Sequence, residues 1–561
     1  MSNLNLRNFW QSIKSDKYLL IALFLGLALR GLNPTFGSPA LYVSNDEAIA
    51  HLSAYNMIAE KSIHSIANYT PLGAYIQIPF LIGSFIAMRV LGLIANIPDF
   101  ELFVLTHEGY FLFIPRLISA LFGVLSILVI YKITLELFDK KHIAILAAIL
   151  AAVSFNLVHI SNTGRPWSVL LFFATLAIYF ALKKRGGLSL FFCAIGFGFH
   201  QGSILVLPML FLLNKSWNFS YFLKIVFFLI TILILNSLVV THGFLESIKN
   251  NQSFLLSDRF LTDFIVGNKN LFNSAVVTLN SNLSIYYLKN FFVTDAVVTF
   301  FGILGLTLTY TKSSRFKLFA LFALSYFIFA SLFFHPLIRY LLPLFILLIP
   351  FASYVINRLI KLPFLIVLIL IFASVNSIWW NSIYIKEPTF VSAQEWVKSN
   401  LSDSVPIAYT GGRFYYFLPT ESAIDYMRNY SSNSFERLNN IGQFNSENKR
   451  DIIFLNKIPG VNKIEKLKNA YKAYGITCVI DYYLDPKESI YSNNPSSFTL
   501  IKRFNPTKNG TLEGIAEPLF DPSSNFDTFE SRPNSSMFSL KTIGPYFDVL
   551  KINQFVFTKM K

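Results

Sequence analysis

The sequence predicts an all-α polytopic membrane bundle of about eleven spans, followed by a C-terminal α/β domain. Apolar residues make up 54% of its 561 residues, whereas charged residues make up only 14%. Within residues 1–385 the apolar residues form runs that repeatedly reach the roughly 20 residues needed to cross a bilayer core. Residues 386–561 contain no such run and alternate helical with strand-like patterns, which predicts the separate domain.

The predicted spans assign residues 1–385 to the transmembrane domain. They lie at about residues 18–36, 117–138, 142–160, 166–183, 188–200, 202–214, 220–240, 292–311, 317–334, 338–356 and 362–381. The first run lacks a small-residue cleavage site and is followed by further spans, so we expect a retained anchor rather than a removed signal peptide. Two consecutive runs are short and meet at His200 in FHQGS, which predicts half-length or tilted helices.

Basic residues gather in short clusters between the predicted spans. These are Lys140 and Lys141, Lys183 to Arg185, Lys215, Lys312 with Arg315 and Lys317, and Arg358 with Lys361. All of them share the cytoplasmic side if the N-terminus is cytoplasmic, as the positive-inside rule requires. This arrangement explains the net charge of +16 without a nucleic-acid partner. The Lys-, Asn-, Ile- and Phe-rich composition indicates an AT-rich genome, and we expect a multi-pass protein of a bacterial inner (plasma) membrane.

The apolar stretch at residues 71–94 would reverse the side of every later basic cluster if it crossed the membrane. It carries Gly73, Pro79 and Arg89, so we expect a juxtamembrane or re-entrant segment at the outer face. The odd number of spans then predicts three extracytoplasmic regions: a first loop at residues 37–116, a second loop at 241–291 and the domain at 386–561.

Several patterns in the C-terminal region predict a small α/β domain. VSAQEWVKSNL and IEKLKNAYKAYG have helical periodicity, whereas PIAYT, RDIIFL and ITCVIDYYL are strand-like. From SNNPSSFTL through FESRPNSS the sequence is rich in Asn, Ser and Pro, which predicts loops.

Cysteine usage and motif content exclude several function classes. Cys193 lies in an apolar run and Cys478 in the hydrophilic tail, so we expect different compartments and no disulfide. The sequence has no CxxC pair, HExxH, phosphate-loop GxxxxGK[ST] or GxGxxG motif. Nucleotide hydrolysis and nicotinamide chemistry therefore have no support.

Asp46 and Glu47 stand side by side in YVSNDEAIAHL, shortly after the first predicted span. Adjacent carboxylates at the rim of an apolar bundle suit a site where a lipid-borne substrate meets a water-soluble one. A solvated loop pair or a helix N-terminal cap is the alternative interpretation. His51 and His64 follow in the same loop, and we expect them to hydrogen-bond within it rather than ligate a metal.

Five segments resemble, in order, the membrane glycosyltransferases of the GT-C fold, especially the branch containing protein O-mannosyltransferases and the bacterial aminoarabinose transferase of lipid A. NDEAIAHLSAYN is similar to the Asp-Glu motif of that family's first loop, and YTPLGAYIQIP to the Pro-Leu-aromatic stretch that follows it. FIPRLISALFGVLSILVIYKITLELF, HPLIRYLLPLF and SAQEWVKSNL are similar to the next span, a late Arg-Tyr span and the start of the outer domain. The resemblance covers most of residues 15–400 and rests on the order of the segments.

The resemblance implies an inverting glycosyltransferase that moves a hexosyl or pentosyl group from a polyprenyl-phosphate donor. The acceptor would be a hydroxyl of a lipid, glycan or protein at the extracytoplasmic face. Asp46 would be the base that removes the acceptor proton. Glu47 would orient Asp46 or help it hold a divalent cation such as Mg²⁺ or Mn²⁺, and the sequence leaves open whether a metal is present.

The departing phosphate requires positive charge or strong hydrogen-bond donors in a poorly hydrated site. Arg339 in HPLIRY is the first candidate, because guanidinium binds phosphate oxygens bidentately. His335, Arg116 and Arg165 are further candidates for binding the phosphate, and His200 for facing the cavity. Snorkelling of the arginines to lipid headgroups and structural roles for the histidines are the alternatives.

Two other function classes compete with the glycosyltransferase. A transporter or flippase of a lipid-linked glycan would also need a polar cavity with cations, but repeated halves with interrupted helices are not evident. A non-catalytic protein that binds lipid-linked sugar, or that acts as an envelope scaffold, would not need the acidic pair. The glycosyltransferase and the transporter can be told apart by whether sugar transfer occurs and requires Asp46.

Overall fold

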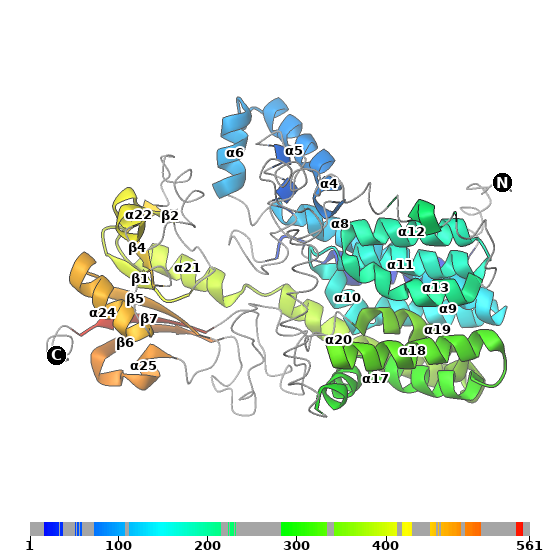
Figure 1. Ribbon diagram of the computed structural model, residues 1–561. Helices are drawn as coiled ribbons and strands as arrows, with labels where there is room; N and C mark the ends of the chain where they lie inside the picture. Colours follow the sequence, from blue (N-terminus) through cyan, green and yellow to red (C-terminus); the bar gives the residue numbers. More distant parts are fainter. Residues whose placement is uncertain are drawn as a thin grey trace, which may run out of the picture.

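A bundle of helices and a smaller α/β domain make up the computed structural model (Figure 1). The structure describes residues 16–32, 34–36, 51, 53–54, 57–58, 72–106, 111–214, 223, 225–228, 231, 282–333, 341–411, 418–428, 449–455, 458, 462–483, 489–505 and 546–553. The chain passes from the bundle to the domain through helices α20 (Pro363–Tyr384) and α21 (Thr389–Asn400). The domain boundary near residue 385 stays a prediction.

The other helices of the bundle follow the predicted apolar runs. They are α2 (Lys17–Gly31), α8 (Phe113–Phe138), α9 (Lys141–Val153), α10 (Phe155–Asn162), α11 (Trp167–Leu182), α12 (Gly186–Phe199), η1 (Gln201–Val206), α13 (Leu207–Asn214), α17 (Asn282–Thr309), α18 (Ser314–Phe333) and α19 (Leu342–Leu359). Among the described residues, five helices are long and apolar enough to cross a membrane, or six if the bent pair α9 and α10 forms one span. The chain is a multi-pass membrane protein, and its span count of eleven stays a prediction.

One predicted span, at residues 142–160, is interrupted by a bend that the sequence did not predict. The structure divides it at Ser154 into α9 and α10, whose axes are bent by 51°. The short helices predicted around His200 are confirmed, because α12 has 14 residues and ends there.

Small residues allow two central helices to pack closely. A Cβ atom added at Gly302 of α17 would lie 2.7 Å from the Cβ atom of Leu348 in α19. Gly305 meets the backbone of Phe351 in the same way, one turn further along. In lipid the hydrophobic effect does not drive helices together, so helix association depends on such close van der Waals packing.

The basic loops meet at one end of the bundle. Phe138, at the end of α8, stacks on Tyr354 of α19 with ring centroids 4.7 Å apart. Lys312, between α17 and α18, donates to the Tyr354 hydroxyl at 2.6 Å. Lys183, after α11, forms an ion pair with Glu136 of α8. These contacts bring the loops around Lys183 and Lys312 to the same end of the bundle. Lys215 lies outside the described residues, and the orientation in the membrane stays a prediction.

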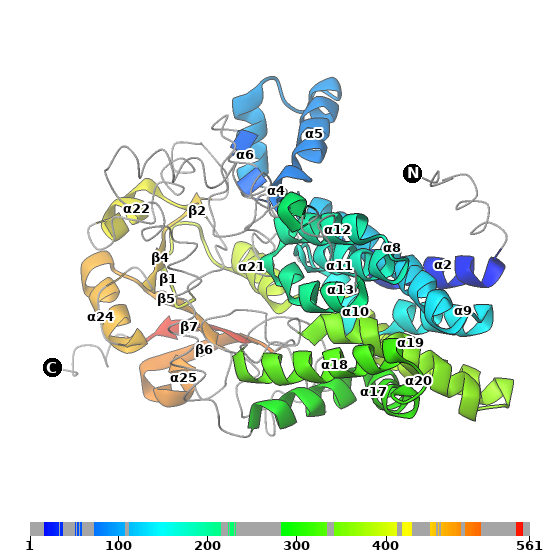
Figure 2. The same ribbon diagram turned by 45° about the vertical axis from the view of Figure 1, so that its right-hand side comes forward.

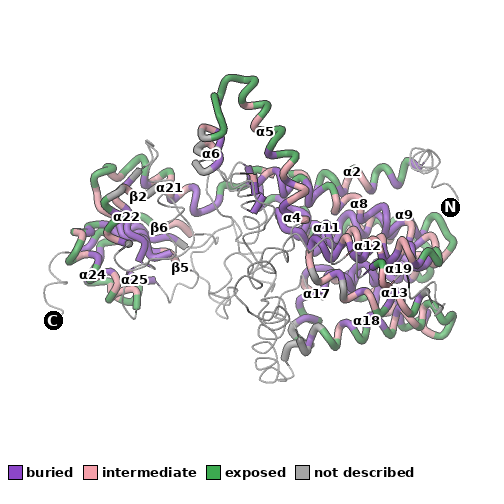
Figure 3. Tube along the Cα trace, turned by 45° about the horizontal axis from the view of Figure 1, so that its top comes forward, coloured by how far each residue is buried: buried purple, intermediate pink, exposed green. Residues whose placement is uncertain are grey.

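Residues 72–106 form a helical hairpin beside the bundle. It consists of α4 (Leu72–Tyr75), α5 (Ile78–Val90) and α6 (Ile97–Thr106). Leu72–Val90 is long and apolar enough for a span. Figures 1 and 2 nevertheless show α5 and α6 rising away from the packed helices, and Figure 3 shows that α5 is mostly exposed. The juxtamembrane or re-entrant placement of this segment stays a prediction.

The C-terminal domain has a five-stranded mixed sheet in the order β4-β1-β5-β7-β6. Its strands are β1 (Ile407–Tyr409), β4 (Ile452–Phe454), β5 (Cys478–Tyr483), β6 (Phe498–Phe504) and β7 (Tyr546–Ile552). Strands β2 (Leu418–Pro419) and β3 (Lys449–Arg450) pair separately, and helices α22 (Glu421–Arg428), α24 (Lys463–Tyr474), α25 (Ile490–Asn493) and η5 (Pro495–Ser497) complete the domain. The β1–β4 and β1–β5 pairs are parallel, and the pairs that involve β7 are antiparallel.

The predicted loop after residue 491 is partly wrong, because β6 lies in it. Strand β6 lies at the edge of the sheet, and its register against β7 shifts between Leu500 and Lys502. The shift interrupts the regular alternation of apolar and polar residues by which a strand is predicted. The domain core includes Trp380 and Tyr384 of α20 and also Phe36 and Phe155. This core therefore continues from the sheet through α21 to the end of α20.

Candidate functional site

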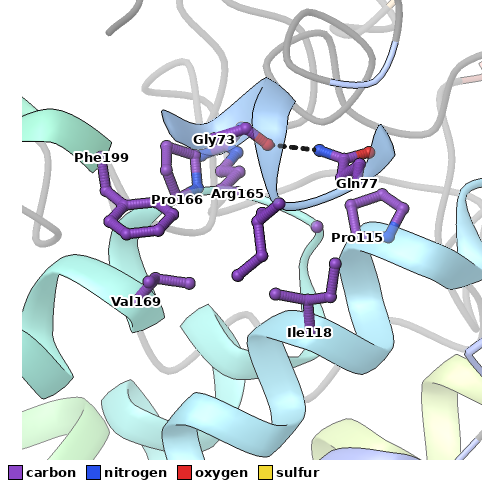
Figure 4. A pocket seen from close by; sticks show the side chains of 10 residues that line it. Gly73, Gln77, Pro115, Ile118, Arg165, Pro166, Val169 and Phe199 are labelled. Carbon is purple, nitrogen blue, oxygen red and sulfur yellow. Dashed lines mark hydrogen bonds between the residues drawn. The ribbon is translucent and has the colours of Figure 1, made fainter. Parts of the chain in front are cut away.

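A small cavity of about 20 Å³ lies where the hairpin meets the bundle (Figure 4). It has room for about one water molecule. Its walls come from the hairpin, the start of α8, the loop between α10 and α11, and the end of α12. They include Gly73, Gln77, Pro115, Arg165, Pro166 and Phe199. We call this space the Gln77 cavity.

Gln77 lines this cavity and contacts His51, which lies nearer the beginning of the first loop. Its side-chain Nε2 donates to the carbonyl of Gly73 at 2.9 Å, as Figure 4 shows. Its Oε1 is then the acceptor for the Nδ1–H group of His51, at 3.0 Å. Both side chains are almost fully buried, and the His51 ring lies over Phe111. The expectation that His51 hydrogen-bonds within the first loop is confirmed.

Arg116 anchors the beginning of the same loop. Its guanidinium donates to the carbonyls of Pro34 and Phe36, at 3.1 and 2.6 Å, and lies 6.0 Å from the Phe36 ring. Arg116 is buried at the start of α8. In this arrangement it orders the chain after α2, and its role in binding phosphate stays a prediction.

Arg165 reaches the cavity from the short loop between α10 and α11. Ser119 of α8 donates to its backbone carbonyl at 3.1 Å, which fixes the loop against the bundle. A Cβ atom added at the neighbouring Gly164 would lie 2.9 Å from Pro115, so only glycine lets the loop approach α8 this closely. Arg165 is buried and lines the Gln77 cavity, and its role in binding phosphate stays a prediction.

His200 does not line the Gln77 cavity. Its Nδ1 accepts from the backbone N–H of Gly202 at 3.0 Å, and its ring lies 4.1 Å from that of Trp167. These contacts order the turn between α12 and η1. The structure thus gives His200 a structural role, the alternative that the sequence had left open.

The remaining predicted site residues lie outside the described residues. They are Asp46, Glu47, His64, His335 and Arg339. Within the described part of the chain, no group of three or more His, Cys, Asp or Glu side chains could hold a metal ion. A metal bound by Asp46 and Glu47 stays a prediction.

Sequence reasoning missed Gln77 as a site residue. The only signal was a single amide within the apolar YIQIP, and its partner His51 is 26 residues away in the chain. An isolated polar residue in an apolar segment needs a hydrogen-bond partner, which predicts a contact without naming the partner.

Comparisons with known proteins extend this description. Residues 111–243 match the family model of dolichyl-phosphate-mannose-protein mannosyltransferases. This match confirms the predicted resemblance to that family over a segment that begins at α8 and includes Arg116 and Arg165. A search of curated proteins found no match.

Three solved structures were also found to be similar. The archaeal oligosaccharyltransferase AglB from Archaeoglobus fulgidus, with an inhibitory peptide and a dolichol-phosphate, is 13% identical, covers 84% of this chain and 69% of its own, and has a TM-score of 0.41. ArnT from Cupriavidus metallidurans bound to undecaprenyl phosphate is 11% identical, with coverages of 86% and 95% and a TM-score of 0.49. Its apo form is 11% identical, with coverages of 89% and 97% and a TM-score of 0.44.

Proposed function

We propose that this protein is an integral-membrane glycosyltransferase that moves a sugar from a polyprenyl-phosphate donor to an acceptor hydroxyl on the extracytoplasmic face. The match to the mannosyltransferase family supports the reaction class. The observation that carries the proposal is the double anchoring of the first loop at one end of the bundle.

The two anchors enclose the acidic pair in the sequence. Arg116 binds the chain at Phe36, and Gln77 binds it at His51. Glu47 is four residues before His51, and an extended chain spans at most about 3.6 Å per residue. Covalent geometry therefore keeps the Cα atom of Glu47 within about 14 Å of that of His51. This reach supports a pair of carboxylates near the Gln77 cavity.

The proposed reaction is a single displacement. The acceptor oxygen attacks the anomeric carbon while the bond from that carbon to the phosphate oxygen breaks, which inverts the configuration. Asp46 takes the acceptor proton, and such general-base help contributes roughly 100- to 10,000-fold. Glu47 orients Asp46 or, together with it, holds a Mg²⁺ or Mn²⁺ ion.

The leaving group is polyprenyl phosphate, whose new negative charge needs stabilisation in a poorly hydrated site. Arg165 fits this role best among the described residues, because it is buried and lines the cavity. Arg116 is close in sequence to Pro115 of the same wall. Arg339 and His335 are proposed to complete the phosphate site from the chain segment before α19.

A transfer assay tests this proposal. The purified protein in lipid nanodiscs receives undecaprenyl-phosphate sugars, each radiolabelled, and an envelope extract as acceptor. We expect labelled product, and Asp46→Asn should reduce its formation by about 100- to 10,000-fold. Asp99→Asn is the matched control, because Asp99 is a half-buried carboxylate of the same loop whose side chain accepts from the backbone N–H of Ala95.

Two outcomes would contradict the proposal. Product formation that is equal in the wild type and in Asp46→Asn would remove the proposed base. Movement of the lipid-linked sugar between leaflets, without transfer and independent of Asp46, would favour a transporter.

A further inference from the structure

The bundle contains a broken helix whose two ends are neutralised by charged side chains from other helices. The break falls between α9 and α10, at Ser154. Breaking a helix inside a bundle frees carbonyl groups on one side and N–H groups on the other, and these groups need partners where water is excluded. The sequence around Ser154 has neither proline nor glycine to explain the bend.

Arg30 of α2 binds the carbonyl side of the break. Its two terminal nitrogens donate to the carbonyls of Ala152 and Ala151, at 2.8 and 2.9 Å. Ser377 of α20 donates to the next carbonyl, that of Val153, at 2.6 Å. Arg30 is buried, and its positive charge meets the negative end of the α9 dipole.

Asp295 of α17 binds the N–H side of the break. Its carboxylate accepts from the backbone N–H groups of Phe155 and Asn156, at 2.8 and 2.9 Å. It also accepts from the side chains of Ser154 and Asn156, at 3.0 and 2.7 Å. Asp295 itself lies at a kink of α17, with φ −138° and ψ 56°, so two interrupted helices meet at one carboxylate.

The break also affects the position of the loop that follows α10. All eight residues of α10 are buried, and Asn162 at its end donates to Asn381 of α20 at 3.2 Å. The chain then continues directly into the loop that carries Gly164 and Arg165 to the Gln77 cavity. The direction in which α10 leaves the break therefore sets the position of Arg165.

We propose that Asp295 and Arg30 are positioning residues, which hold the break between α9 and α10 so that the following loop places Arg165 at the Gln77 cavity. Each charge is neutralised by the end of a half-helix and by polar groups. The link to phosphate binding rests on the proposed function, whereas the restraint on α10 does not.

Hydrogen exchange in nanodiscs tests the restraint without any need for activity. Asp295→Asn keeps the size of the side chain but loses the charge and one acceptor, and amides of residues 154–166 should exchange at least about tenfold faster, since a tenfold change corresponds to roughly 1.4 kcal/mol. Asp16→Asn is the matched control, because Asp16 is a buried carboxylate that caps α2 and pairs with Lys141 at the opposite end of α9. Its exchange in residues 154–166 should equal that of the wild type.

A double-mutant cycle tests whether Asp295 acts through Arg165. Binding of undecaprenyl phosphate is measured by native mass spectrometry for Asp295→Asn, Arg165→Ala and the double variant. A positioning role predicts that the double variant loses little more affinity than Arg165→Ala alone, whereas independent effects would multiply. Multiplying losses, or unchanged exchange in Asp295→Asn, would overturn the proposal. If Asp295→Asn does not fold, Arg30→Lys decides by the same two measurements.

These measurements separate the two proposals. A wild type that binds undecaprenyl phosphate but transfers no sugar would contradict the proposed function only. The exchange and binding results would still decide the role of Asp295.

Discussion

Replacing Gln77 with leucine is expected to loosen the anchor of the first loop. The change preserves most of the side-chain volume but removes the acceptor of the His51 Nδ1–H group and the donor to Gly73. Because His51 is completely buried, its unsatisfied donor costs about 1–3 kcal/mol. This cost corresponds to local opening that is roughly 5- to 150-fold more frequent, since 1.4 kcal/mol is a factor of ten.

Hydrogen exchange of peptides that contain residues 51–58 measures this opening. Gln77→Leu should accelerate their exchange within the stated range. The double variant Gln77→Leu with His51→Phe should exchange nearly as the wild type does, because two apolar groups of similar shape leave no unsatisfied donor. Equal exchange in the wild type and in Gln77→Leu would refute the reasoning, and so would a double variant that opens as often as Gln77→Leu.

Other consequences concern the domain, the bundle and the topology. Burial raises the pKa of Asp481 to about 6 from 3.8, so the folded chain keeps this proton between about pH 4 and 6 while the unfolded chain releases it. Stability should therefore fall by up to about 3 kcal/mol as the pH rises through that window, and Asp481→Asn should flatten this part of the pH profile of thermal unfolding. Gly302→Leu should lower the midpoint of thermal unfolding by the equivalent of about 1–3 kcal/mol through overpacking on α19, and an unchanged midpoint would contradict the close contact. Reporter fusions after Lys184 and Trp380 should report the cytoplasmic and the extracytoplasmic side, and an inside signal after Trp380 would reverse the predicted topology.

Local sequence patterns were sufficient to predict many of the helices and strands. The run that forms α8 is mostly apolar, and α24 has a capping Asn462 and a Gly475 with φ 71° at its two ends. The clusters of Lys and Arg likewise predicted that the loops around Lys183 and Lys312 lie at one end of the bundle.

Contacts between residues far apart in the chain could not be predicted from such local patterns. The bend at Ser154 depends on Asp295, which is 141 residues away, and the local sequence resembles an uninterrupted span. Strand β7 is more than 60 residues from β5 in the chain, so its pairing with β5 could not be predicted from periodicity alone.

The same distinction applies to the candidate site. The chemistry of Arg165 and Arg116 was predictable because a cation near a span needs a partner. That Arg116 binds backbone carbonyls, whereas Arg165 lines a cavity, depends on the tertiary packing of α8 against the loop after α10.

A structure determined by electron cryomicroscopy in nanodiscs, with undecaprenyl phosphate added, tests the central claim most directly. The account predicts the carboxylates of Asp46 and Glu47 at the end of the bundle that holds the Gln77 cavity, with the lipid phosphate beside Arg165. Carboxylates at the end with the basic loops, or a phosphate bound far from both acids, would contradict it.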